Sequence, residues 1–191
     1  ANTSASVTWN DETVEITGPS VTFIPAGDSV VEFTTDCTFS GFFTTHADDL
    51  VNLCSNAKGY EVDPNVPPMT PWPDPVGGFK VRSYSVDFPI ENGRFGRIFR
   101  CTTLMVNFLD PRVGPRDPST LSPHEHADFQ QCSLVLDGTY FHHLRRPWLS
   151  DKGLWVDDVH AEIGAPSVTF IPAQVIHTSE AAGDARNHLV D

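Results

Sequence analysis

Two histidines open the stretch Pro123-His-Glu-His-Ala-Asp-Phe-Gln-Gln-Cys-Ser-Leu-Val-Leu-Asp-Gly138, and an apolar run follows them before the closing glycine. In an extended strand, residues two apart project to the same face, so His124 and His126 would point the same way, about 7 Å apart along the strand. Two imidazoles on one face can share a metal ion. Because His-x-His pairs also occur on solvated surfaces, this pair alone does not establish a metal site.

A third histidine ends the segment Gly164-Ala-Pro-Ser-Val-Thr-Phe-Ile-Pro-Ala-Gln-Val-Ile-His177. Together the two segments resemble the paired motifs of the cupin superfamily, His-x-His-x(3 or 4)-Glu-x6-Gly followed by Gly…Pro-x-Gly-x2-His. The matching positions are His124, His126, Gly138, Gly164, Pro172 and His177. The resemblance covers about residues 95–190 and requires an insertion over residues 147–160. It implies one divalent metal ion held by the three histidines.

Two positions depart from the family pattern. The family's metal-binding Glu is here a Gln, either Gln131, which keeps the spacing to Gly138, or Gln130, which keeps the shorter gap after His126. We favour Gln131 as the fourth metal ligand and keep Gln130 as the alternative. The Gly of Pro-x-Gly is replaced by Gln174, so the turn before the third histidine must form without a glycine's freedom at positive φ.

The substitution of Gln for Glu changes the expected chemistry of the metal. Three neutral imidazoles and an amide oxygen leave the ion its full double positive charge, which makes it a stronger Lewis acid and favours an anionic, chelating substrate. If the glutamine does not bind, a three-histidine site results, an arrangement known among cupin dioxygenases. We expect Fe²⁺, although imidazole donors also suit Zn²⁺, Ni²⁺, Mn²⁺ and Cu²⁺.

Four further residues are candidates for catalysis or substrate binding. Tyr140 and His142 would share one strand face, and a histidine beside a metal could act as acid or base. Arg145 could make a forked contact with a substrate carboxylate, or it could lie on the exposed rim. Asn107 interrupts an apolar strand and either lines the barrel or is a wall residue. For His142, a hydrogen bond in the wall is the competing interpretation.

The rest of the chain alternates short apolar runs with turns, which predicts an all-β fold. The chain has 13 Gly and 16 Pro. Strands are expected over residues 21–24, 30–33, 39–44, 79–88, 97–108, 132–136, 140–144 and 167–171. The resemblance implies that these strands form a double-stranded β-helix, the jelly roll or cupin barrel, over residues 79–191.

An N-terminal extension is expected over residues 1–78. Within it, residues 46–58 carry early acidic residues, apolar residues at helical spacing and a late Lys, which predicts a short helix. Residues 63–78 are rich in proline and predict an irregular segment. Pro19-Ser-Val-Thr-Phe-Ile-Pro-Ala26 recurs unchanged at residues 166–173. The repeat is either the trace of a duplicated domain or two instances of a good strand-and-turn sequence, and its first copy lacks a histidine at the position matching His177.

Charge and composition limit the classes of partner that the protein is expected to bind. The net charge of −13 would repel nucleic acid and anionic membranes, and no apolar run approaches the ~20 residues that span a bilayer. Four cysteines without a Cys-x-x-Cys pair favour free thiols in a reducing compartment. We therefore expect a cytoplasmic protein with a small-molecule substrate. Open sheet edges of a jelly roll need cover, so strands within residues 20–44 are expected to pair in a homodimer.

The resemblance implies a metal-dependent oxidoreductase of the dioxygenase type, acting on a small anionic or enolisable molecule. Two alternatives remain open. One is a cupin isomerase or lyase, in which the metal stabilises an enediolate. The other is a cupin that binds a small molecule without catalysis, because this fold serves many functions.

Overall fold

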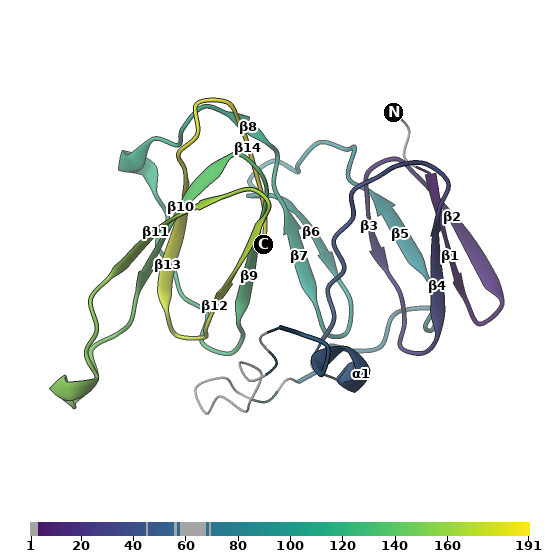
Figure 1. Cartoon of the computed structure of the whole chain (residues 1–191), viewed down its shortest axis with the longest axis horizontal. Coiled ribbons are helices and arrows are strands. Elements are labelled where there is room, and N and C mark those ends of the chain that lie inside the picture. The colour runs from purple at the N-terminus through teal and green to yellow at the C-terminus, as the bar shows by residue number, and fades with distance from the viewer. Residues whose placement is uncertain (1–3, 45, 56, 58–67, 69) are drawn as a thin grey trace. The chain divides into compact units, whose positions relative to one another are not determined.

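The computed structural model describes residues 4–44, 46–55, 57, 68 and 70–191. The chain forms two compact units, the first comprising Ala1–Ala57 and Thr70–Met105 and the second comprising Lys58–Met69 and Val106–Asp191 (Figure 1). The sequence placed the start of the barrel at residue 79, whereas residues 79–105 group with the first unit. No helix in the described residues is long and apolar enough to cross a membrane.

The first unit contains two small antiparallel sheets. One has the order β2-β1-β4, with β1 at Ser4–Trp9, β2 at Glu12–Thr17 and β4 at Ser29–Phe33. The other pairs β3 (Ser20–Phe23) with β5 (Arg82–Ser85), and β6 (Arg97–Arg100) follows in the chain. The β1–β2 turn uses Asn10 and Asp11, both at positive φ, as a two-residue hairpin requires.

In the N-terminal region, the helix is shorter than expected and one expected strand does not form. Helix α1 spans only Asp48–Val51, a single turn with two acidic residues at its start. The prediction of a helix over 46–58 was too long, and residues 56 and 58 lie outside the described part. Residues 39–44 form no strand. In the proline-rich segment, residues 63–67 and 69 are not described, and residues 70–75 are irregular as expected.

The second unit contains two antiparallel sheets, and buried residues from both sheets form one core. One sheet has the order β11-β10-β13, with β10 at Thr139–Arg145, β11 at Val159–Gly164 and β13 at Ile176–Ala181. The other runs β12-β9-β14-β7, with β7 at Met105–Phe108, β9 at Gln131–Asp137, β12 at Ser167–Ile171 and β14 at Arg186–Val190. Strand β8 (Arg112–Val113) also pairs with β14. This antiparallel arrangement confirms the predicted all-β fold and is consistent with a jelly roll.

The core of the second unit draws on both sheets. Val135, Tyr140, Ala181 and Leu189 form one buried cluster, with one residue from each of β9, β10, β13 and β14. Gly138 makes the turn from β9 to β10 at φ +79°, and a Cβ there would collide with the backbone of β14. Only glycine fits this motif position without strain.

The loop between β10 and β11 occupies the range expected for an insertion. It carries a short 3-10 helix, η3 (Lys152–Leu154), and extends beyond its sheet at the lower left of Figure 1. A second 3-10 helix, η2 (Pro118–Thr120), precedes the first histidine motif. The insertion is thus a surface loop rather than a break in the barrel strands.

Both copies of the repeated octapeptide form strands. β3 pairs with β5 in the first unit, and β12 pairs with β9 in the second. The positions that follow the two copies differ in environment, since Val30 is 57% exposed and His177 is 2% exposed. The repeat therefore encodes similar local structure in two different settings, and only the second copy leads to a histidine in the core.

Candidate metal centre

Three histidines from two segments meet in the second unit. His124, His126 and His177 each bring one ring nitrogen to within 4.8 Å of the others. Backbone hydrogen bonds hold the segments together: the His124 N–H donates to the His177 carbonyl at 3.0 Å, and the reverse bond is 2.8 Å long. The N–H of Gln174 donates to the His126 carbonyl at 2.7 Å. Main-chain pairing thus fixes the approach of the three rings.

In two of these histidines, a hydrogen bond to a backbone carbonyl determines which ring nitrogen keeps a free lone pair. Nδ1 of His124 lies 2.9 Å from the Ser122 carbonyl, and Nδ1 of His177 lies 2.8 Å from the Val175 carbonyl. Each Nδ1–H donates to its carbonyl, which leaves Nε2 as the nitrogen with the lone pair. The third ring, that of His126, stacks on Phe129 with centroids 4.2 Å apart.

The side-chain oxygen of Gln131 points at the same place. Its Oε1 lies 3.0 Å from Nε2 of His126 and 3.1 Å from Nε2 of His177. Gln130, the alternative from the sequence, is exposed just before β9 begins. The structure therefore brings Gln131, and not Gln130, to the histidines.

A chain of hydrogen bonds orients the Gln131 amide. Its Nε2 donates to Ser133 Oγ at 3.2 Å, and Ser133 Oγ donates to Asp191 Oδ1 at 2.5 Å. Because the hydroxyl gives its single proton to the carboxylate, it can only accept from the amide, so the amide oxygen turns toward the histidines. Burial raises the pKa of Asp191, while hydrogen bonds from Ser133 and Gln131 and the charges of two histidines act against this.

Neither of the two residues that support Gln131 was predicted from the sequence. Ser133 had a usable signal, since residues two apart in a strand share a face. Asp191 had none, because it lies far along the chain and reaches Ser133 only through the pairing of β14 with β9.

The donor set fits a divalent transition metal. Burial lowers the pKa of His177, and the charges of His124 and His126 lower it further against the hydrogen bond to Val175. The neutral ring that results presents Nε2, without a proton, to Gln131 Oε1 at 3.1 Å. Two hydrogen-bond acceptors at this distance repel each other, and a cation bound by both would remove that repulsion. Imidazole nitrogens and an amide oxygen are ligands that Fe²⁺, Zn²⁺, Ni²⁺ and Cu²⁺ accept.

His142 lies on the core-facing side of the same sheet as His177. It is fully buried, and its Nδ1 lies 2.9 Å from Ser179 Oγ. Its Nε2 is buried without a hydrogen-bond partner among the described residues. Burial lowers the pKa of His142, and the charges of His143 and His177 contribute. His142 therefore presents a buried ring nitrogen, unbonded within the described residues, on the same sheet face as His177.

The other predicted residues lie in three different settings. Tyr140 packs in the core cluster, and burial raises its pKa to about 12. Arg145 is exposed and its guanidinium makes a forked ion pair with Asp158, so the expected fork is already occupied. Asn107 pairs through its backbone with Asp191, and its side-chain Oδ1 is buried without a partner in the described part of the chain.

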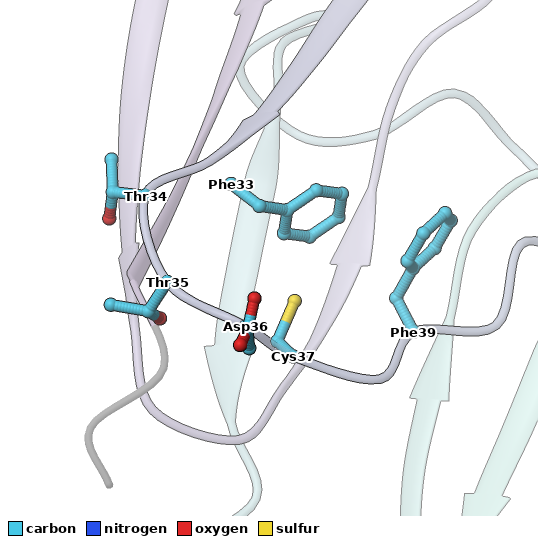
Figure 2. Close-up of a pocket in the computed structure, with 6 residues that line it drawn as sticks. All are labelled: Phe33, Thr34, Thr35, Asp36, Cys37 and Phe39. Atoms are coloured by element: carbon cyan, nitrogen blue, oxygen red, sulfur yellow. The ribbon is translucent and has the colours of Figure 1, made fainter.

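A separate hollow of about 330 Å³ lies in the first unit, where the segment after β4 curves back on itself (Figure 2). Its lining consists of Phe33, Thr34, Thr35, Asp36, Cys37 and Phe39. The rings of Phe33 and Phe39 stack at 4.8 Å and form one wall. The lining contains one carboxylate and no histidine, so this hollow lacks the donors of the metal centre.

Comparisons with protein-family models and with curated proteins found no match. Among solved structures, the chain is similar to hydroxypropylphosphonic acid epoxidase from S. wedmorenis in complex with fosfomycin, with 19% identity and a TM-score of 0.33. The alignment covers 54% of this chain and 57% of the epoxidase, so the chain spans just over half the length of that protein.

Proposed function

We propose that the second unit is a metal-dependent cupin enzyme, an oxidoreductase of the dioxygenase type that acts on a small anionic or enolisable molecule. One observation carries the proposal: three imidazoles and the oxygen of Gln131 converge with no carboxylate among them. A neutral donor set leaves a bound divalent ion its whole charge, which favours an anionic substrate. An Fe²⁺ ion at this position would supply Lewis acidity and redox chemistry toward dioxygen.

The protein's own residues have separate roles in this proposal. His124, His126 and His177 hold the ion, and the carbonyls that bind two of their Nδ1–H groups keep the rings in place. Gln131 completes the donor set, with its amide turned by Ser133. These contacts are made before substrate arrives, so binding costs little rearrangement.

His142 supports a second candidate function. Its buried Nε2 has no hydrogen-bond partner among the described residues and lies on the same sheet face as His177, so it could hold or release a substrate proton. Proton transfer next to a Lewis acid is the chemistry of an isomerase or lyase acting through an enediolate. In this case the reaction needs no dioxygen.

Oxygen uptake and proton exchange separate these functions. Metal-stripped protein would be loaded with Fe²⁺ and incubated with a panel of small enolisable carboxylates in D₂O. Oxygen consumption that depends on His177 supports the oxidoreductase, and deuterium incorporation without oxygen consumption supports the isomerase or lyase. His46→Ala, which removes an exposed histidine of the first unit, is the matched control. If the protein binds metal but shows neither reaction with any compound of the panel, the result would contradict an enzymatic role and favour a protein that binds a small molecule without catalysis.

A further inference from the structure

We propose that His143 and His160 form a second, independent metal site on the opposite face of the β11-β10-β13 sheet, suited to Cu²⁺ or Ni²⁺. The two residues are direct partners in the pairing of β10 with β11. Their Nδ1 atoms lie 2.8 Å apart, and their ring planes meet at 62°. This pair has no role in the proposed enzyme reaction, and the inference does not depend on it.

The distance between the two nitrogens indicates the metal geometry. Bonds of about 2.0–2.1 Å to both nitrogens, at the observed separation, correspond to a nitrogen–metal–nitrogen angle of about 90°. This is the angle between neighbouring ligands in square-planar or octahedral coordination, and it is smaller than the tetrahedral angle. The pair therefore suits Cu²⁺ and Ni²⁺, which accept square-planar and tetragonal nitrogen sites, better than it suits Zn²⁺.

Glu180 prepares one of the two rings for metal binding. Its Oε2 lies 3.0 Å from Nε2 of His143, on the side of the ring away from His160. When the Nε2–H donates to this carboxylate, the lone pair is on Nδ1, the atom that faces the partner ring. A carboxylate behind a metal-binding histidine fixes the tautomer and makes the ring a stronger donor.

The charges around the pair favour a cation. Glu162 and Glu180 lie on either side of Phe141 in the strand register, two register positions from the two histidines and therefore on the same face. The nearby Asp158 is already matched by Arg145. Neither carboxylate pairs with a Lys or Arg in the described part of the chain, and Glu180 forms an ion pair only with His143, so the two raise the local cation affinity.

The site is open to solvent and separate from the core. His160 is exposed, and the side chain of His143 is 24% exposed. His143 follows the fully buried His142 in the strand, and neighbouring strand residues project to opposite faces. The two metal sites therefore share no ligand.

Equilibrium dialysis against Ni²⁺ tests the proposal on the whole chain. Wild type and His46→Ala are expected to bind two equivalents, whereas His160→Ala and His177→Ala should each bind one. His160→Gln, which keeps a polar side chain of similar length, covers the case in which the alanine variant does not fold. Glu180→Gln should keep the second equivalent with an affinity about 10-fold weaker. Retention of both equivalents by the folded His160 variants would overturn the proposal.

Cu²⁺ added to His126→Ala/His177→Ala provides a spectroscopic readout. The expected electron paramagnetic resonance spectrum shows coupling to two nitrogens and is lost on adding His143→Ala. A spectrum that His143→Ala leaves unchanged would contradict the assignment. Because this background lacks two histidines of the metal centre, the result is independent of whether that centre binds metal or catalyses a reaction.

Discussion

Gln131 occupies the position where the family motif carries a metal-binding Glu, and its oxygen faces two of the three histidines. Gln131→Glu adds an anionic donor, so metal affinity should rise by about 10-fold while Lewis acidity and turnover fall. Competition with a chelator measures the affinity. Gln130→Glu is the matched control, since it adds the same charge at an exposed position. Equal effects of the two changes would contradict a role for Gln131 as ligand.

Ser133 determines which way the Gln131 amide points. Ser133→Ala removes the acceptor of the amide and the donor to Asp191, so metal affinity should fall by about 10-fold or more, as for other residues that orient ligands. Calorimetric titration with the metal measures this change. Ser167→Ala, on the strand next to β9, removes a buried hydroxyl that has no partner in the described residues and should leave affinity unchanged. A similar loss in both variants would show a general packing effect.

At the scale of residues, the three histidines could be found from the sequence because two lie in one strand-like motif and the third ends a second motif. The choice of Gln131 over Gln130 followed from the spacing to Gly138. Asp191 could not be found, since its contact with Ser133 depends on how distant strands pair. Arg145 was assigned to substrate by residue type, but its ion pair with Asp158 depends on register.

The turn between β12 and β13 is the element that delivers His177. Gln174 adopts φ +64° in this turn, a conformation that costs a side chain other than glycine roughly 1–2 kcal/mol. Gln174→Gly removes this strain, but glycine also gives the unfolded chain more conformational entropy, which opposes the gain. The net effect should be a rise of about 0.5–1 kcal/mol in the free energy of unfolding. Urea denaturation measures it. The control is Gln130→Gly, which replaces a glutamine whose φ is not positive and should lower the free energy of unfolding. A lower free energy of unfolding in Gln174→Gly would contradict the prediction.

At the scale of elements, apolar runs were predicted and polar strands were missed. The runs over 132–136, 140–144 and 167–171 correspond to β9, β10 and β12. β13, with the sequence Ile176-His-Thr-Ser-Glu-Ala181, has too few apolar residues to read as a strand, and its pairing with β10 defines it. Residues 39–44 look like a strand by composition, but the structure gives them no ladder partner.

Protonation of buried histidines links the stability of the whole molecule to pH. His142, His177 and His188 have pKa values lowered mainly by burial, from the ordinary value of 6.5. The unfolded chain therefore binds more protons than the folded protein below that value, and stability of the metal-free protein should fall as pH decreases from about 7.5 to about 6. Urea denaturation at both pH values tests this, and higher stability at the lower pH would contradict it.

The metal content of the purified protein tests the central claim most directly. Elemental analysis would be made on protein purified without added metal, in a His160→Ala background so that the second proposed site does not contribute. About one divalent ion per chain is expected, falling close to zero in His126→Ala and His177→Ala and unchanged in His46→Ala. Metal content that is the same in the first two variants as in their parent would show that His124, His126 and His177 do not form the metal centre.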